Sequence, residues 1–329
     1  MHWTGKRVVV TGAGGFIGSH LVGELISAGA DVTAVVRYNS RNDDGNLSEL
    51  PDPIREQMRV VRIELTDPDA VRKAIGGIDT VFHLAAFVGI PYSYTNPQDV
   101  ITNNVLSTLN LLVASRDAGV RRFVQTSTSE VYGSARSIPI SETHVLQPQS
   151  PYSASKISTD SIAMSFWHTY QLAVCIVRPF NTFGPRQSAR AIIPSVICQA
   201  LAGGDVRVGS TDTTRDFTYV SDTVRGFIMA AQSDPAIGEA TNIGTGREIS
   251  IDAAIRLIVD ITGGSAKIVQ DESRVRPATS EVSRLCADVQ KAKRILGFSS
   301  EIGFEAGLRA TVDWIREHPG RFKPASYNV

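Results

Sequence analysis

Short apolar runs alternate with longer amphipathic stretches through the first half of the chain. The apolar runs have no polar face, which is typical of strands covered on both sides in a parallel sheet. Predicted strands are Arg7–Val10, Val32–Val36, Val60–Ile63, Thr80–Leu84, Arg122–Thr126 and Ala173–Arg178. Predicted helices, with apolar residues at helical spacing, are Phe16–Ala28, Asp69–Ala74, Asn96–Ala118 and Tyr152–Tyr170. The alternation predicts an α/β fold with a Rossmann-like, doubly wound parallel sheet.

The pattern changes after the last of these strands. Pro179–Arg190 combines proline, glycine and polar residues, which indicates a functional loop. Asn39–Gln57 is polar and rich in turn residues, so we expect it to form a mobile segment on the surface. Further helices are expected at Ile193–Ala202, Ile251–Ile261, Asp288–Leu296 and Phe304–Glu317. We expect a dinucleotide-binding domain at 1–178 with a return segment near 217–245. A smaller C-terminal substrate-binding lobe would then comprise 179–216 and 246–329.

Composition narrows the classes of partner. The 33 basic and 33 acidic side chains give a formal charge of zero, so no long-range field attracts nucleic acid or an anionic membrane. The three cysteines are an odd number and far apart, which indicates free thiols of a reducing compartment. The chain begins in a strand pattern without a signal peptide, and no apolar run reaches the roughly 20 residues that span a bilayer. We therefore expect a cytoplasmic protein, and we expect no metal.

A glycine-rich turn follows the first predicted strand. The sequence TGAGGFIG places Gly12, Gly15 and Gly18 where the backbone must turn tightly and let a pyrophosphate approach. The first N–H groups of the next helix, around Phe16 and Ile17, then face the anion. The spacing is Gly-x-x-Gly-x-x-Gly instead of the more common Gly-x-Gly-x-x-Gly. These five residues are the predicted binding site for the cofactor phosphates.

Residues at the ends of the next strands bear on the cofactor's identity. Arg37 stands where an acidic residue would accept hydrogen bonds from the adenosine ribose, so a 2′-phosphate and NADP are favoured over NAD. Glu64 and Leu65 are expected at the adenine edge. Ala85 and Ala86 provide small residues where a nicotinamide ribose would lie close.

A tyrosine and a lysine form the candidate catalytic pair. Tyr152 and Lys156 are four residues apart near the start of a predicted helix, so both project from one face. An ammonium beside a phenol is expected to lower the phenol's pKa and favour the phenolate. The phenolate could then take a proton from a sugar hydroxyl while hydride leaves the same carbon. The preceding strand ends in TSTSEVYG, and its hydroxyls, including those of Thr128 and Ser129, are expected to reach the same cleft.

These motifs carry a family resemblance. TGAGGFIG, HLAA, TSTSEVYG, PYSASK and RPFNTFGPRQ stand in the order and spacing of the extended short-chain dehydrogenases that modify nucleotide sugars, from about Lys6 to Trp314. Thr128-Ser129-Glu130 is similar to the pattern of GDP-mannose 4,6-dehydratase. QPQSPYSASK and RPFNTFGPRQSARAIIP resemble the UDP-N-acetylglucosamine-type 4,6-dehydratases of nonulosonic acid pathways. One departure is Ser129, because dTDP-glucose dehydratases carry aspartate there.

The resemblance implies a mechanism and a set of roles. Tyr152, assisted by Thr128, would deprotonate the C4 hydroxyl while hydride passes to the nicotinamide. Glu130 would remove the C5 proton as water leaves from C6, and hydride would return to C6. Because Ser129 replaces aspartate, protonation of the leaving hydroxyl is open between Glu130 itself and a relay through Ser129.

The resemblance also implies contacts with a nucleotide-diphosphate sugar. Asn181 would meet the nucleotide phosphate, and guanidinium forks suited to the diphosphate are offered by Arg186, Arg215 and Arg276. The segment RDFTYV resembles the family's diphosphate clamp followed by a return strand to the sheet. Ser93 is a candidate contact to the sugar, and Asn104 is expected to hold backbone carbonyls or water. The family further suggests a homodimer through the helices Asn96–Ala118 and Tyr152–Tyr170.

Three alternatives stay open beside the 4,6-dehydratase. A nucleotide-glucuronate decarboxylase shares the first oxidation and the Thr-Ser-Glu pattern, but loses carbon dioxide instead of water. A 4-epimerase does not need a carboxylate at position 130. A non-catalytic dinucleotide-sensing regulator would keep the fold, but should lose the Tyr-Lys pair. The segments Ile90–Pro97 and Gln187–Pro194 favour the dehydratase.

Overall fold

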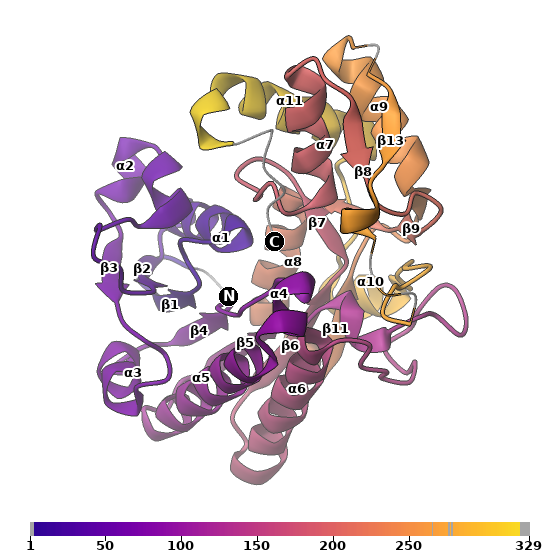
Figure 1. Ribbon diagram of the computed structural model, residues 1–329. Coiled ribbons are helices and arrows are strands. Elements are labelled where there is room, and N and C mark those ends of the chain that lie inside the picture. The colour runs from indigo at the N-terminus through magenta and orange to yellow at the C-terminus, as the bar shows by residue number, and fades with distance from the viewer. Residues whose placement is uncertain (1–2, 265, 276, 278, 323–329) are drawn as a thin grey trace.

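The computed structural model describes residues 3–322 except 265, 276 and 278. A seven-stranded parallel sheet with the order β11-β6-β5-β4-β1-β2-β3 forms its centre (Figure 1). The strands are β1 (Arg7–Thr11), β2 (Asp31–Val36), β3 (Arg59–Arg62), β4 (Thr80–His83), β5 (Arg122–Thr126), β6 (Val174–Pro179) and β11 (Ala240–Ile243). The order reverses between β1 and β4, which creates a crevice at the carboxyl ends of these strands. The predicted α/β class and all six predicted strands are confirmed.

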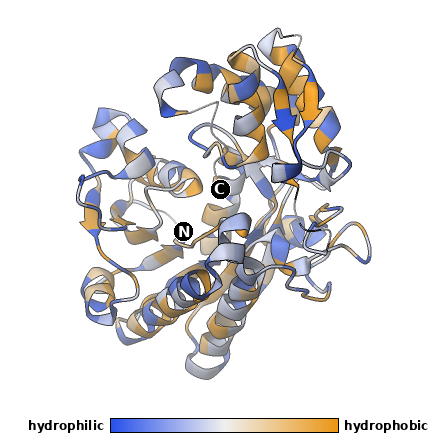
Figure 2. Ribbon diagram, in the orientation of Figure 1, coloured by the Kyte–Doolittle hydropathy of each residue, from blue (hydrophilic) through white to orange (hydrophobic). Residues whose placement is uncertain are grey.

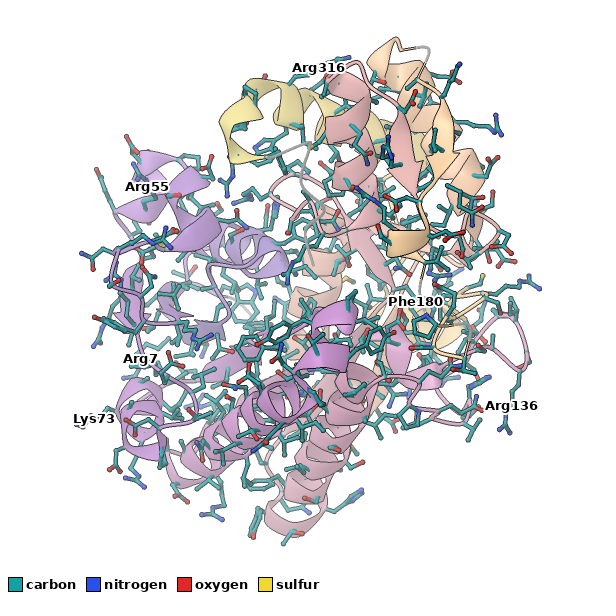
Figure 3. The ribbon with its side chains drawn as sticks, in the orientation of Figure 1. Arg7, Arg55, Lys73, Arg136, Phe180 and Arg316 are labelled. Atoms are coloured by element: carbon teal, nitrogen blue, oxygen red, sulfur yellow. The ribbon has the colours of Figure 1, made fainter. Side chains whose placement is uncertain are left out.

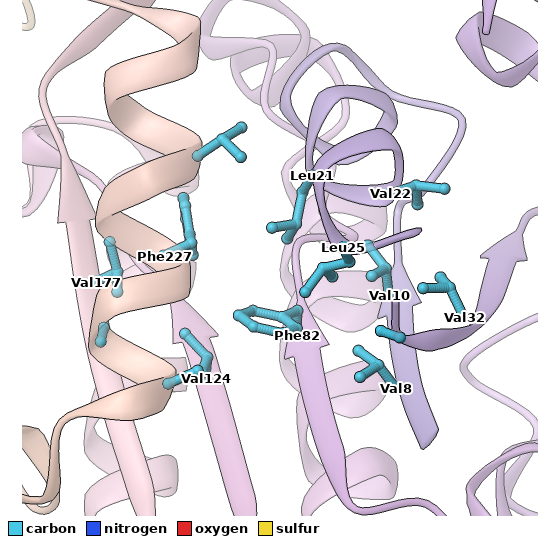
Figure 4. Packing of buried hydrophobic residues seen from close by; sticks show 14 of the residues in the cluster. Val8, Val10, Leu21, Val22, Leu25, Val32, Phe82, Val124, Val177 and Phe227 are labelled. Atoms are coloured by element: carbon cyan, nitrogen blue, oxygen red, sulfur yellow. The ribbon is translucent and has the colours of Figure 1, made fainter. Parts of the chain in front are cut away.

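Helices cover both faces of the sheet. One face carries α1 (Phe16–Ser27) and α8 (Val220–Gln232), and the other carries α3 (Pro68–Ile75), α5 (Pro97–Asp117) and α6 (Pro151–Tyr170). Side chains alternate across a strand, so Val8 and Val10 pack under α1 while Val9 packs on the opposite side. The core under α1 also includes Phe82 and Phe227 (Figure 4). This two-sided burial explains why the strands lack a polar face.

The C-terminal lobe has a core of its own. Its elements are α7 (Ile192–Leu201), α9 (Ile251–Thr262), α11 (Phe304–Glu317) and the parallel pair β8 (Val206–Val208) and β13 (Ile268–Gln270). Hydrophobic residues occupy β13 and the helices around it (Figure 2). An aromatic group comprising Phe183, Phe217 and Phe304 closes this core toward the sheet. Charged side chains such as Arg55, Lys73 and Arg316 point outward (Figure 3).

Two interpretations of the sequence are corrected. Asn39–Gln57 was expected to be a mobile excursion, yet it contains η1 (Gly45–Glu49) and α2 (Asp52–Arg55), and its Leu47 is buried against α1. The backbone amide of Asn46 in this segment donates to the Gly14 carbonyl at 2.9 Å, so the segment contacts the glycine turn directly.

The segment after Arg215 also differs from expectation. Phe217–Tyr219 forms β10, which pairs with β7 (Asn181–Phe183) outside the main sheet. The chain then enters α8, which the sequence interpretation missed, and β11 is the strand that returns to the sheet beside β6. The signal for α8 was present, because Val220, Val224 and Phe227 recur at helical spacing.

The three cysteines, Cys175, Cys198 and Cys286, are free and buried, as predicted. Across the part of the chain that the structure describes, no helix has the length and apolar character needed to cross a bilayer.

Candidate functional site

A cleft of about 850 Å³ opens where the carboxyl ends of the strands meet the C-terminal lobe. Phe180, between β6 and β7, lies at the junction of the two (Figure 3). Most of the predicted site residues line this cleft: Gly12, Gly15, Phe16, Ile17, Gly18, Arg37, Glu64, Leu65, Ala85, Ala86, Thr128, Ser129, Glu130, Tyr152, Asn181 and Arg215. The fold therefore brings together residues that lie more than 200 positions apart in the sequence.

The glycine turn forms a cradle that side chains would fill. Gly12 has φ +67°, and a Cβ there would lie 2.7 Å from the amide nitrogen of Ala85. A Cβ at Gly18 would collide with the Gly12 carbonyl oxygen. Gly15 is the N-cap of α1 and supplies no side chain to its first N–H groups. A cofactor pyrophosphate fits this arrangement, because it needs both close backbone approach and unoccupied N–H donors.

The adenosine end of the cleft contains an ion pair that the sequence did not reveal. The Arg37 Nε lies 3.2 Å from the Glu64 Oε1, and its guanidinium carbon lies 5.4 Å from the Phe87 ring centroid. The Arg37 side chain remains 66% exposed, so it is also open to solvent in the cleft. A cofactor 2′-phosphate would therefore compete with the Glu64 carboxylate for Arg37.

A buried histidine supports the opposite end of the cofactor region. His83 Nε2 lies 3.0 Å from Thr108 Oγ1, which itself donates to the Asn104 carbonyl at 2.8 Å. Thr108 must then accept from His83 Nε2–H, and His83 Nδ1 must accept from Thr11 Oγ1 at 2.8 Å. Burial lowers the pKa of His83 to about 3, and the charge of Lys156 acts in the same direction. A neutral imidazole of fixed tautomer thus links β1, β4 and α5.

Asn104 holds the backbone after β4, as predicted. Its side-chain oxygen accepts from the Phe87 amide at 2.8 Å, and its nitrogen donates to the Phe87 carbonyl at 3.2 Å. The same nitrogen donates to Ser155 Oγ at 2.9 Å, next to the candidate lysine on α6. Asn104 therefore links the backbone after β4 to α6.

Tyr152 and Lys156 lie on the buried face of α6, with 6% and 3% of their surfaces exposed. Burial raises the pKa of Tyr152, a hydrogen bond with Thr128 opposes this rise, and the charges of Glu130 and Asp160 add to it. Burial lowers the pKa of Lys156 to about 8, against the attraction of Asp160. The expected lowering of the tyrosine pKa by the lysine is thus wrong for this state, because desolvation outweighs the favourable contacts. Lys156 does not line the cleft.

Glu130 presents a carboxylate to the cleft. It stands in η2 (Ser129–Tyr132), where its backbone amide donates to Thr128 Oγ1 at 3.2 Å. Within residues 3–322 as described, its carboxylate makes no hydrogen bond or ion pair. The Glu130 carboxylate therefore does not cap a helix or form a salt bridge with a described residue, and it is available to a ligand. Ser129 is buried beside it and also lines the cleft.

The predicted substrate contacts separate into two groups. Asn181 and Arg215 line the cleft, and Arg215 pairs with Glu281 at 2.9 Å. Arg186 does not line it, because its guanidinium hydrogen-bonds to His20 of α1. Ser93 is also outside the wall, since its buried hydroxyl donates to the Ile90 carbonyl at 2.7 Å. The structure thus corrects the placement of Arg186 and Ser93, while Arg276 lies outside the described residues.

Several residues near the site were missed from the sequence. Arg190, Arg274 and Glu281 line the cleft on the side of the C-terminal lobe. Asp160 and Arg178 form a buried ion pair of 3.2 Å below it. Asp160 follows Lys156 by four residues on the same helix, which is a spacing that could have identified it. Arg190 and Glu281 lie outside helices and strands, and Arg274 ends the short helix η4 (Glu272–Arg274), so no local pattern encodes their placement at the cleft.

Comparison with known proteins agrees with this geometry. The family model described as GDP-mannose 4,6 dehydratase matches residues 9–311. A dTDP-glucose 4,6-dehydratase from Streptomyces griseus is 34% identical over 326 residues, covering 97% of this chain and 96% of that protein. A UDP-N-acetyl-alpha-D-glucosaminuronate decarboxylase from Bacillus cytotoxicus is 33% identical over 324 residues, covering 95% and 98%.

A solved structure shares the whole fold. A UDP-glucuronic acid 4-epimerase variant from Bacillus cereus, in complex with UDP-4-deoxy-4-fluoro-glucuronic acid and NAD, superposes with a TM-score of 0.87. It is 31% identical, and the match covers 95% of this chain and 99% of that one.

The glycine cradle, the parallel sheet and the Tyr152–Lys156 helix define an extended short-chain dehydrogenase/reductase of the class that modifies nucleotide sugars. The chain belongs to the GDP-mannose 4,6-dehydratase family. Its relatives include dehydratases, decarboxylases and 4-epimerases, so family membership establishes a nucleotide-sugar enzyme and does not by itself select the reaction.

The buried His83 generates a prediction about acid stability. Its pKa falls from 6.5 in the unfolded chain to about 3 in the folded protein, so the unfolded state binds more protons between these values. The stability that this group contributes is present above pH 6.5 and is lost as pH falls below it, by ~2 kcal/mol at pH 5. Urea unfolding at pH 7 and pH 5 should show this loss in the wild type and a smaller one in His83→Gln. The exposed His168→Gln should match the wild type, and an unchanged loss in His83→Gln would contradict the assignment.

Proposed function

We propose that the chain is a nucleotide-sugar 4,6-dehydratase that uses NAD(P). The observation that carries this proposal is the unpartnered Glu130 carboxylate, which lines the same cleft wall as Tyr152 and its hydrogen-bonding partner Thr128. Oxidation at C4 needs only the tyrosine, but elimination across C5 and C6 also needs a base at C5. A 4-epimerase has no use for that second base.

Family membership and the glycine cradle make NAD(P) the cofactor. Gly12, Gly15 and Gly18 would hold its pyrophosphate at the start of α1. Ala85 and Ala86 would lie along the nicotinamide side, with Tyr152 and Lys156 opposite. When bound, the nicotinamide supplies the hydride acceptor for C4 and the hydride donor for C6.

The side chains of the protein handle the protons. Tyr152 accepts the proton of the C4 hydroxyl, and the Thr128 hydrogen bond stabilises the phenolate that this requires. The resulting ketone acidifies the C5 proton, which Glu130 removes while hydroxide leaves C6. The leaving group takes its proton from Glu130, either directly or through the neighbouring Ser129 hydroxyl. With hydride returned to C6, C5 takes up a proton from solvent and Tyr152 releases the proton that it accepted, so the products are water and a 4-keto-6-deoxy sugar nucleotide.

The phosphates and the sugar would be held from the lobe side. Arg215 is positioned for the diphosphate and is kept in place by Glu281 and by its own donation to the Thr214 carbonyl at 2.9 Å. Asn181 offers a buried side-chain oxygen that has no hydrogen-bond partner among the described residues. Both would gain partners when a nucleotide-diphosphate sugar enters, which favours the bound state.

A decarboxylase of nucleotide uronic acids is the second candidate. Arg190 lines the cleft and makes no side-chain ion pair with any residue the structure describes, so a substrate carboxylate could pair with it. The decarboxylase relative, at 33% identity, also supports a decarboxylase as the second candidate. The sequence around Ile90–Pro97 and Gln187–Pro194 favours the dehydratase. No observation supports a non-catalytic regulator.

We also propose a homodimer formed through α5 and α6. Ile101, Leu106 and Leu109 on α5 and Tyr170 on α6 are exposed apolar side chains, although both helices are otherwise well packed. A second copy covering these helices would remove that surface from water.

The function is tested by incubating the protein with UDP-, GDP-, CDP- and dTDP-hexoses and with the corresponding uronic acids. We expect one hexose to give a 4-keto-6-deoxy product, identified by mass spectrometry as the loss of one water. Release of carbon dioxide from a uronate with no keto-deoxy product from any hexose would establish the decarboxylase instead.

Glu130→Gln tests the assignment of the C5 base. We expect turnover to fall about 10²- to 10⁴-fold, because general-base catalysis at C5 is lost. Exchange of the C5 hydrogen with deuterated water should stop, while cofactor affinity is unchanged. Glu305→Gln, on the outer helix α11, is the control and should exchange normally. Normal exchange in Glu130→Gln would remove this residue from the mechanism.

The choice between NADP and NAD is tested at Arg37 and Glu64. We propose that NADP is preferred because Arg37 pairs with a 2′-phosphate. Arg37→Asp should lower the ratio of NADP to NAD affinity by about tenfold or more, since a charge-assisted hydrogen bond is lost. Glu64→Gln should raise the ratio, because the competing carboxylate is gone. Fluorescence titration with NADPH and NADH measures both, and Arg55→Gln on α2 is the control. An unchanged ratio in Arg37→Asp would contradict the proposal.

A further inference from the structure

A third ionisable residue shares the buried face of α6 with the proposed catalytic pair. Tyr152, Lys156 and Asp160 are spaced four residues apart, so they follow one another along the helix. Asp160 is 3% exposed and follows Lys156 by about one turn of α6. A buried carboxylate at this position is costly unless it serves a partner.

The contacts of Asp160 divide between its two oxygens. Oδ2 accepts from Ser127 Oγ at 2.7 Å and from Arg178 Nε and Nη2 at 3.3 and 3.2 Å. Oδ1 is buried and has no hydrogen-bond partner among the described residues. The ion pair with Arg178 therefore uses only one oxygen of the carboxylate, and the charge of the whole group also acts on Lys156.

Asp160 reaches the tyrosine through the end of β5. Ser127, which donates to Asp160, immediately precedes Thr128, which hydrogen-bonds to Tyr152. Arg178 is itself fixed from the far side, because its Nη1 donates to the Tyr132 hydroxyl at 3.0 Å and Tyr132 donates to Asn242 at 2.7 Å. The network thus connects α6, the end of β5, β6 and β11 below the cleft.

We propose that Asp160 is a positioning residue whose negative charge stabilises the Lys156 ammonium and whose hydrogen bond to Ser127 fixes the strand end that carries Thr128. This inference rests on the proposed roles of Tyr152 and Lys156 in the oxidation of the sugar. A purely structural ion pair with Arg178 would need neither the helical spacing from Lys156 nor the link to Thr128.

The negative charge of Asp160 acts to raise the pKa of both Lys156 and Tyr152. It opposes the lowering of the Lys156 pKa that burial causes, and it adds to the raising of the Tyr152 pKa. The other charged or titratable groups facing the pair are His83 of β4, Glu130 of η2 and Arg178 of β6. His83 is neutral above about pH 3, so it does not titrate in the working range.

Asp160→Asn tests the proposal through the pH profile of C4 oxidation, followed as cofactor reduction in a single turnover. One limb of the profile should report Lys156, near pH 8 in the wild type. Because removing the negative charge of Asp160 favours deprotonation of the Lys156 ammonium, this limb should move to lower pH. The matched control is Asp234→Asn, which removes the acidic partner of another buried arginine, Arg122, at 2.7 Å. A Lys156 limb that stays in place while only the amplitude of C4 oxidation falls, as in the control, would overturn the proposal.

A second readout needs no substrate. Lysine labelled with ¹³C at Cε should show one resonance that is absent in Lys156→Met and that titrates near pH 8. In Asp160→Asn this titration should move to lower pH, and an unmoved midpoint would contradict the inference whatever sugar the protein uses. If Asp160→Asn does not fold, Asp160→Asn/Arg178→Met removes both buried charges together and should give a smaller shift in the same direction. C4 oxidation is common to dehydratase, decarboxylase and epimerase, so an error in the proposed reaction does not affect either readout.

Discussion

The burial of an ionisable helix face against the carboxyl edge of the sheet is the constraint on which the site depends. Tyr152, Lys156 and Asp160 are all withdrawn from water, and isolated charges at such depth would be strongly disfavoured. The compensation comes from Arg178 and from hydroxyl groups on neighbouring strand ends. The same desolvation that makes these groups costly brings the lysine pKa to about 8. Desolvation therefore accounts both for the cost of burying this helix face and for the lowered pKa of Lys156.

Both lobes contribute residues to the wall of the cleft. The sheet supplies the glycine cradle and the fixed His83 and Asn104 contacts, which have little freedom to adapt. The C-terminal lobe contributes Arg190, Arg215 of β9 (Thr214–Arg215) and Glu281 to the cleft wall, beside a separate hydrophobic core.

The sequence predicted the sheet and the cleft wall because both are encoded locally. Apolar runs identify the strands, and the glycines, TSTSEVYG and PYSASK each stand beside a strand or helix end. The local sequence could not predict the side-chain contacts of Arg37, Arg186 and Asp160. Arg37 meets Glu64 across 27 residues and Arg186 meets His20 across 166, so whether either guanidinium is available to a ligand depends on tertiary contacts. The helix α8 was missed although its pattern is present, because the expected return strand was assigned to the same segment.

The fate of the hydrogen on C4 tests the proposed reaction most directly. The protein would be incubated with a turned-over sugar nucleotide that carries deuterium on C4, and the product analysed by NMR. A 4,6-dehydratase moves this hydrogen to C6, so we predict deuterium in the new methyl group of a 4-keto-6-deoxy sugar. Deuterium that returns to C4, with loss of carbon dioxide or with inverted configuration, would contradict the dehydratase and identify the decarboxylase or the epimerase.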